Sequence, residues 1–237
     1  MHQRLTCYLL ILISLIFFLA YPLPLGAQRP DGTNSGNHFV RVPTTALPAL
    51  TALGLTPQIS LDYGSFHWFE LNEADFARLS ASNIPFEEDL EAGQVRLMNF
   101  TFDPARSGEP ALPAQMRADA TTSTGFWLVQ FTGPIKDEWL ARLAASGMRL
   151  LQYYPHHSYL VWASPSQARA TEALDFVRWQ GPFHPAYKIN TELAQKQGRI
   201  ENVDIMFYND GDIEATLGAI RRLGGVELQH YPSQPDR

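Results

Sequence analysis

An internal repeat constrains the fold of this 237-residue chain more than any other feature of its sequence. Sliding the chain along itself by 77 residues aligns an ordered set of identical residues without a gap. The matched pairs are Leu140 with Leu217, Gly147 with Gly224, Leu151-Gln152 with Leu228-Gln229, and Tyr154-Pro155 with Tyr231-Pro232. A shift of 93 relates the first part of the chain more weakly, for example by matching Gly54 to Gly147. Such self-similarity indicates one supersecondary unit used repeatedly, so the sequence predicts two clear copies and one divergent copy.

The middle copy can be assigned element by element. Apolar and aromatic runs predict strands, and apolar side chains at helical spacing (Trp139 and Leu143) predict a helix that ends at Gly147. The predicted elements are strand Phe126–Phe131, helix Asp137–Ser146, strand Met148–Tyr154, strand Ser158–Ala163, helix Pro165–Ala173 and strand Phe176–Trp179. This β-α-β-β-α-β order is typical of a ferredoxin-like sandwich, with helices on one face of an antiparallel sheet and Trp139, Leu143 and Val161 in its core.

The other two copies follow the same pattern to different extents. The first copy predicts strands Phe39–Val42, Ile59–Leu61, Phe66–Leu71 and one from Phe86 onward, with helices Thr45–Leu53 and Glu73–Ala81. The last copy predicts only strand Val203–Tyr208, helix Ile213–Leu223 and strand Glu227–Tyr231. The predicted fold class is therefore α+β, with tandem ferredoxin-like modules of which the last is incomplete.

Turn-forming residues divide the chain between these modules. Stretches rich in Gly, Pro, Asn, Ser and Thr are typical of leaders and linkers rather than packed elements. The predicted segments are a flexible leader (28–37), a first module (38–103), a mobile linker (104–124), a second module (125–189), a linker (190–202) and a partial third module (203–237).

The N-terminus predicts export. Arg4 precedes an uncharged, largely apolar stretch that ends in prolines and a small-residue site, which is the pattern of a signal peptide (1–27) cleaved after Ala27. An uncleaved membrane anchor is the alternative. Cys7 is the only cysteine, so the mature chain would hold no disulfide and no Cys-ligated metal. We therefore expect a secreted bacterial protein.

Charge narrows the classes of partner. Lys and Arg number 18 against 24 Asp and Glu, for a net charge of -6. Nucleic-acid binding needs clustered cations, and the three lysines are far apart. The sequence therefore predicts neither a nucleic-acid partner nor binding to an anionic membrane surface, and membrane contact only through the signal segment.

A set of motifs in the middle copy resembles a known family. They are Phe126–Phe131, Gly133-Pro134, Tyr154-Pro155, Tyr159-Leu160-Val161, Val177-Arg178-Trp179, Gly181-Pro182 and Pro185-Ala186-Tyr187-Lys188. Together they resemble the non-catalytic region that precedes the protease domain in secreted bacterial subtilisin-like serine proteases. The resemblance runs from about Phe39 to the end and is strongest from Gly125 to Lys188. It implies prosegment-like modules that assist folding of the protease domain and inhibit it until cleavage.

The chain departs from that family where chemistry would be expected. The family's Asp-Thr-Gly, His-Gly-Thr-His and Gly-Thr-Ser motifs do not occur, and neither does Gly-x-Ser-x-Gly. We therefore predict no enzyme activity, no catalytic residue and no cofactor for this chain. The predicted function is a prosegment-like folding aid or inhibitor, with a subtilisin-like protease domain as partner, in a chain truncated before the catalytic domain. A free-standing exported protein-binding module is the first alternative, and an enzyme with an unrecognised site is the second.

Other polar clusters have structural explanations. His156-His157 lacks a third ligand at metal-site spacing, so a solvated hairpin tip is expected. Asn209–Asp212 lacks the full calcium-loop pattern, and Asp212 is expected to cap the following helix. The acidic group Glu87–Asp89 and Glu91 is expected to form a solvated turn, and the Asn99 sequon is expected to arise by chance. No metal site is predicted.

One segment is a candidate protein contact. The extended stretch after the last strand of the second module contains Phe183, His184, Tyr187 and Lys188. Its prolines keep it out of a helix, and its aromatic residues could anchor an extended inhibitory contact. The alternative is a segment folded back on its own module.

Overall fold

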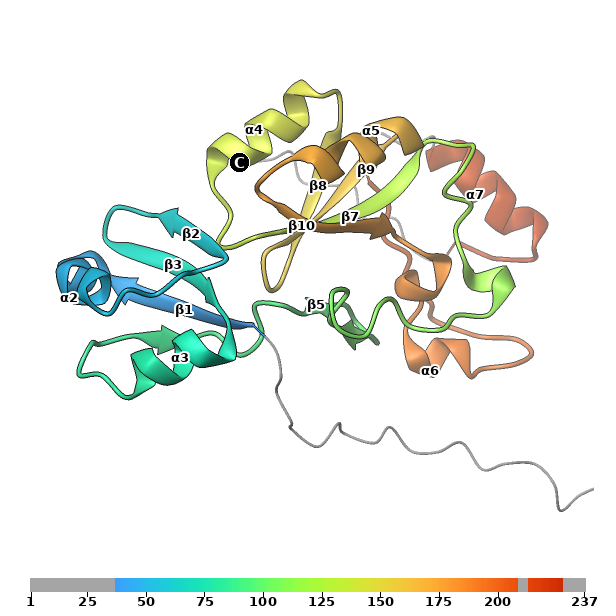
Figure 1. Cartoon of the computed structure of the whole chain (residues 1–237). Helices are drawn as coiled ribbons and strands as arrows, with labels where there is room; N and C mark the ends of the chain where they lie inside the picture. The colour runs from blue at the N-terminus through green and yellow to red at the C-terminus, as the bar shows by residue number, and fades with distance from the viewer. Residues whose placement is uncertain (1–36, 209–212, 228–237) are drawn as a thin grey trace, which may run out of the picture. The chain divides into compact units, whose positions relative to one another are not determined.

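Strand pairing in the computed structural model defines two four-stranded antiparallel sheets and one small hairpin (Figure 1). The structure describes residues 37–208 and 213–227. The described residues belong to one compact unit. The predicted α+β class with antiparallel sheets is confirmed. The predicted signal peptide, its cleavage after Ala27 and nearly all of the leader lie outside the described residues.

The first sheet has the strand order β2-β3-β1-β4. Its strands are β1 (His38–Pro43), β2 (Ile59–Asp62), β3 (Phe66–Leu71) and β4 (Glu87–Glu88). A 3-10 helix η2 (Thr44–Ala46) and α2 (Leu47–Ala52) connect β1 to β2, and α3 (Glu73–Ser80) connects β3 to β4. Alternate residues of β1 and β3 pack under these helices, in a core that includes Val40, Phe69 and Leu79.

The second sheet has the strand order β10-β7-β9-β8. Its elements are β7 (Gly125–Phe131), α4 (Asp137–Ala145), β8 (Arg149–Tyr154), β9 (Ser158–Ala163), α5 (Pro165–Ala170), η4 (Thr171–Ala173) and β10 (Val177–Pro182). The helices cover one face, where Phe131, Trp139 and Phe176 stack with ring centroids 5.4–6.1 Å apart. Trp139, Leu143 and Val161 are buried, which confirms the predicted core.

Local sequence explains where these helices begin and end. Asn72 caps α3 by accepting a hydrogen bond from the Asp75 N–H, and Ser164 and Gln167 form a capping box at α5. Three glycines that the repeat aligns follow α2, α4 and α7 (Ile213–Arg222), and all adopt positive φ: Gly54 at 61°, Gly147 at 83° and Gly224 at 86°. The aligned glycine therefore ends a helix in each copy of the repeat. It does so at a positive φ, which a residue without a Cβ adopts without strain.

The last copy does not follow the predicted pattern throughout. Helix α7 is present, but Val203–Tyr208 forms no strand, so that prediction is wrong. A strand needs a neighbour to accept its backbone hydrogen bonds, and none of the described strands pairs with this segment. Its Ile205 and Met206 side chains remain exposed. In the predicted strand Glu227–Tyr231, Glu227 is not in a strand and the other residues lie outside the described ranges.

A third layer covers the second sheet on the face opposite its helices. The hairpin of β5 (Val95–Arg96) and β6 (Thr101–Phe102) contributes to it, as do the 3-10 helix η3 (Ala114–Met116) and the 3-10 helix η5 (Pro185–Lys188). In Figure 1, α4 and α5 lie on one side of this sheet and β5 on the other. The short helix α6 (Thr191–Ala194) follows η5.

Residues 104–124, which were expected to form a mobile linker, pack within this third layer. Leu112 and Met116 contact its core, and the Ala118 N–H donates to His184 Nδ1 at 3.0 Å. The predicted domain boundary at residue 103 divides residues that share one continuous core. Strands β5 and β6 precede this boundary, but they pack against the second sheet rather than the first. The sequence signal that was overlooked is the presence of apolar side chains, such as Leu112 and Met116, among the turn-forming residues of this segment.

Candidate functional site

The predicted contact segment is part of the protein core. Phe183, His184 and Tyr187 are all buried, and Phe183 and Tyr187 pack against Leu128 and Leu160 of the second sheet. His184 Nε2 is 3.0 Å from Glu109 Oε2, and its Nδ1 accepts the Ala118 N–H. The structure therefore corrects the prediction for these three residues: they hold the third layer in place and offer no free surface. This agrees with the alternative that the segment folds back on its own module.

Lys188 differs from the other three residues of that segment. It is exposed, and its Nζ lies 4.3 Å from the centroid of the Phe126 ring. Partial burial of its ammonium group nevertheless lowers the pKa of Lys188 below its usual range. Its cation–π contact ties it to the second sheet, so it too has a structural role.

The face of the first sheet opposite its helices is also covered, in this case by the second half of the chain. Trp68 on β3 donates its indole N–H to the Thr132 carbonyl across this contact at 3.1 Å, and both groups are buried. Tyr63 donates its hydroxyl to the Pro134 carbonyl. A Cβ at Gly133 would lie 2.9 Å from both Leu61 and Trp68, so only glycine allows so close an approach. We call this contact the inter-sheet interface.

A buried ion pair lies in the same interface. Arg178 Nη1 on β10 is 2.9 Å from both carboxylate oxygens of Glu70 on β3. The side chains are only 11% and 6% exposed, respectively. The guanidinium group also lies 4.7 Å from the centroid of the Phe39 ring. Separating an ion pair this buried would leave an uncompensated charge, which is strongly destabilising.

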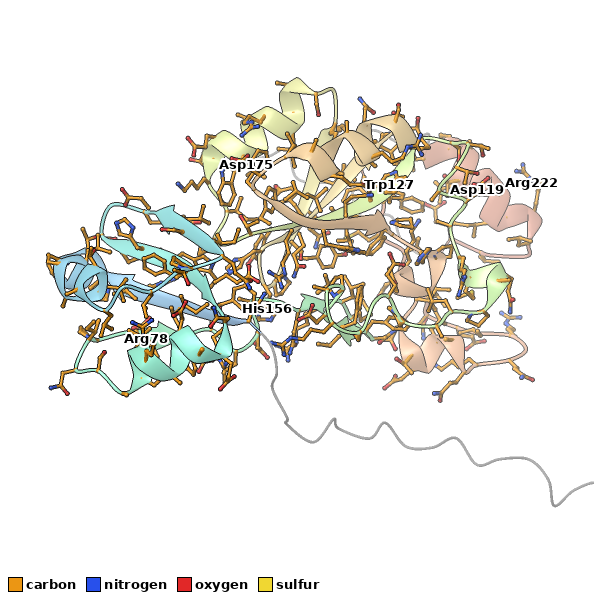
Figure 2. All side chains as sticks on the ribbon, in the orientation of Figure 1. Arg78, Asp119, Trp127, His156, Asp175 and Arg222 are labelled. Carbon is orange, nitrogen blue, oxygen red and sulfur yellow. The ribbon has the colours of Figure 1, made fainter. Side chains whose placement is uncertain are left out.

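The turn between β8 and β9 inserts two histidines into the inter-sheet interface. Their side chains are 16% and 14% exposed for His156 and His157. His156, labelled in Figure 2, places Nε2 3.2 Å from Glu91 Oε2, and His157 packs edge-on against Trp68. The predicted solvated hairpin tip is therefore wrong. The polar turn is buried because the first sheet, together with the segment that follows this sheet in the chain, covers the two histidine side chains.

The acidic group remains partly solvated, as predicted, but three of its carboxylates contact histidines. Glu88 accepts a hydrogen bond from His38 Nδ1 at 2.7 Å, and Asp89 and Glu91 face His157 and His156. The side chains of Glu87, Glu91 and Asp89 remain 79%, 45% and 38% exposed, respectively. These carboxylates are each engaged by a different histidine, so they do not form a convergent acid–base pair.

Two buried polar side chains of the second sheet were missed by sequence analysis. Gln130 and Ser158, cross-strand partners on β7 and β9, are completely buried. Gln130 donates to the Gln94 carbonyl at 3.1 Å, whereas Gln130 Oε1 and Ser158 Oγ have no protein partner. The available signal in the sequence was Gln130, a polar residue within the otherwise apolar run of β7. Buried polar atoms of this kind are usually hydrogen-bonded to ordered water.

Two hollows flank β2, an end strand of the first sheet. One, of about 280 Å³, is lined mainly by apolar side chains of α2 and the sheet together with Ser60 and His67. The other, of about 370 Å³, is lined by Leu61 together with Lys136 and Trp139. Successive residues of a strand point to opposite faces, so Ser60 and Leu61 border different hollows. This arrangement suits an added strand, whose alternate side chains would enter the two hollows in turn.

The remaining predicted sites add no chemistry. Among the residues that the structure describes, no group of three or more His, Cys, Asp or Glu is placed to hold a metal ion. Asn99 donates its side-chain amide to the Ile189 carbonyl. Asn209–Asp212 lies outside the described ranges. Within 37–208 and 213–227, no helix has the length and apolar character needed to cross a bilayer.

Comparison with known proteins identifies one similar family. The model described as "Domain of unknown function (DUF8729)" matches residues 96–184. No curated protein and no solved structure matches the chain. The matched range begins within β5 and ends at His184, so it includes the hairpin, residues 104–124 and the whole second sheet. The part of the chain that is similar to this family thus follows the packing of the second sheet and its third layer.

Proposed function

We propose that the chain is an exported, non-catalytic protein-binding region built from two ferredoxin-like modules, and that it acts as a prosegment-like folding aid or inhibitor of a subtilisin-like serine protease. The partner would be the protease domain, either in the same chain or in another. No catalytic residue, cofactor or nucleic acid enters this proposal.

The strand order of both sheets is the observation that carries the proposal. In each sheet the first strand lies between the third and the fourth, and the second strand pairs only with the third. All neighbouring strands are antiparallel. This strand order supports the proposal that both modules are β-α-β-β-α-β sandwiches, as the resemblance to prosegments implies.

The covered faces limit how such a region could bind a protease. The second sheet's free face is filled by the third layer, and the first sheet's is filled by the second half of the chain. Edge strands remain available for main-chain pairing, and β2 is the one flanked by two hollows. We therefore place the protease contact at β2, where an extended segment of the partner would add to the first sheet.

The test is inhibition of a subtilisin-like protease by the purified chain, with Ser60→Lys as the diagnostic variant. A lysine at this exposed edge position would put a charge beside the apolar hollow and block strand addition. Ser80→Lys, at an exposed position of α3, is the matched control. We expect the parent chain and S80K to inhibit and S60K to lose at least tenfold in affinity at unchanged thermal stability. Equal inhibition by both variants would remove β2 from the proposal, and no inhibition by the parent chain would refute the prosegment role.

A free-standing exported binding module is the second candidate. It is favoured by the packing itself, since both sheet faces are satisfied within the chain and need no protease to cover them. Refolding of a denatured subtilisin-like protease domain separates the two functions. Faster recovery of activity with the chain present supports the prosegment role, and an unchanged rate supports the free-standing module.

A further inference from the structure

His157 occupies an unusual position at the centre of the inter-sheet interface. Its backbone has a positive φ of 63°, so the turn directs the ring inward. The ring centroid is 5.2 Å from that of Trp68, at an interplanar angle of 89°. Its buried Nε2 has no hydrogen-bond partner, and the nearest carboxylate oxygen, on Asp89, is 3.9 Å away. The pocket thus fits a neutral imidazole and gives an imidazolium ion no direct hydrogen bond.

The charged groups around the ring do not compensate for that burial. Asp89, which follows β4, favours protonation of His157, while His156 in the same turn and Arg41 on β1 oppose it. Glu91 pairs with His156, and Glu70 pairs with Arg178. These two carboxylates are therefore already engaged by side chains other than His157.

We infer that the inter-sheet interface is an acid-labile latch: protonation of His157 separates the first sheet from the second while each sheet stays folded. The ring can take up a proton readily only when the turn leaves Trp68 and reaches water. Leaving also breaks the buried hydrogen bond from Trp68 to Thr132, because the His157 carbonyl accepts the Phe131 N–H at 2.8 Å and so ties the turn to the segment that carries Thr132. The latch requires no partner protein, so it stands independently of the proposed function.

The sign and size of the effect follow from proton linkage. The pKa of His157 is lowered from 6.5 to about 4 in the closed state, mainly by burial; Asp89 opposes this shift, and His156 and Arg41 add to it. The open state has the higher pKa and binds more protons between pH 6.5 and 4, so acidification across this window favours opening. A shift of this size corresponds to an increase of up to about 300-fold in the opening constant.

Hydrogen exchange of two indole N–H groups provides the test on the full chain. The Trp68 indole donates across the interface, whereas the Trp127 indole donates to the Ala163 carbonyl within the second sheet. Both bonds are 3.1 Å long and buried, so Trp127 is an internal control. NMR would follow both exchange rates from pH 7 to pH 4, each normalised to the rate of free tryptophan at the same pH.

Two variants complete the design. His157→Asn removes the titrating group and suits a positive φ, and His156→Asn makes the same change at the neighbouring position, where φ is 60°. We expect Trp68 protection to fall by about 100-fold between pH 7 and pH 4 in the parent chain and in H156N, because the closed-state His157 is itself half protonated at pH 4, with Trp127 unchanged. In H157N the Trp68 protection should not depend on pH. Parallel loss of protection at Trp127, a pH-independent Trp68 in the parent, or an unaltered pH response in H157N would each overturn the latch.

Discussion

Replacing Arg178 by methionine tests whether the buried ion pair holds the inter-sheet interface together. The guanidinium group contacts both oxygens of Glu70 at 2.9 Å, and little of either side chain reaches solvent. Methionine would fill much of the volume but leave the Glu70 carboxylate buried, with the Asn37 amide as its remaining side-chain donor. Leaving one charge of a buried pair uncompensated costs about 3–5 kcal/mol, so we expect a loss of that size in the free energy of unfolding.

Arg142→Met is the matched control for this experiment. Arg142 pairs with Asp175 at 3.4 Å, but these side chains are 53% and 86% exposed. Each arginine also lies over a ring, Phe39 for Arg178 and Phe176 for Arg142, so both variants lose a cation–π contact. Exposed pairs contribute about 0–1 kcal/mol, and we expect the control to lose no more than about that.

Urea unfolding followed by circular dichroism measures both variants on the same scale. Combining Arg178→Met with Glu70→Leu should recover most of the lost stability, because no charge then remains buried. If Arg178→Met costs no more than Arg142→Met, the argument from burial is refuted.

Three further outcomes follow from the structure. Leu143→Ala should cost about 2–5 kcal/mol in urea unfolding, because Leu143 is completely buried on the core-facing side of α4; a loss below 1 kcal/mol would contradict the packing of that core. Ser164→Ala should cost about 1 kcal/mol by removing the capping box of α5, and a Ser164→Asp variant that keeps the cap should retain most of that stability. Burial opposes protonation of His38, but hydrogen bonds to Glu88 and Glu73 raise its pKa above 6.5. His38 therefore stabilises the fold below pH 6.5 and loses this contribution as pH rises through its folded pKa, which an NMR titration and the pH dependence of stability in His38→Gln would detect.

Elements with a local cause were predictable from the sequence. The helix stop at Gly147 and the helix start at Pro165 depend on neighbouring residues, and both are found where the sequence predicts them. The apolar run of β7 and the helical spacing of Trp139 and Leu143 likewise predicted the helix-covered core. Short-range periodicity carries this information because one strand or helix presents one face to one layer.

The third layer and the inter-sheet interface were not predictable in this way. The core that contains Leu128 draws on the β5–β6 hairpin, β7, β9 and η5, and no local pattern in the sequence relates these segments. The His156-His157 turn has the composition of a solvated tip and becomes buried only through a sheet formed about 90 residues earlier. For the same reason Phe183 and Tyr187 were interpreted as free anchors, although they fill the chain's own core.

The position of the β5–β6 hairpin in the chain has a consequence for synthesis on the ribosome. Phe102 leaves the ribosome 85 residues before Tyr187, with which it packs in the completed protein (187 − 102 = 85). At about 5–20 residues per second, that interval lasts about 4–17 s. The first sheet can complete its own helix-covered core during this time, since all its strands and helices precede residue 89. The nascent chain must then carry Val95, Leu97 and Phe102 uncovered until the second sheet and η5 emerge, so this interval is when aggregation competes most strongly with folding.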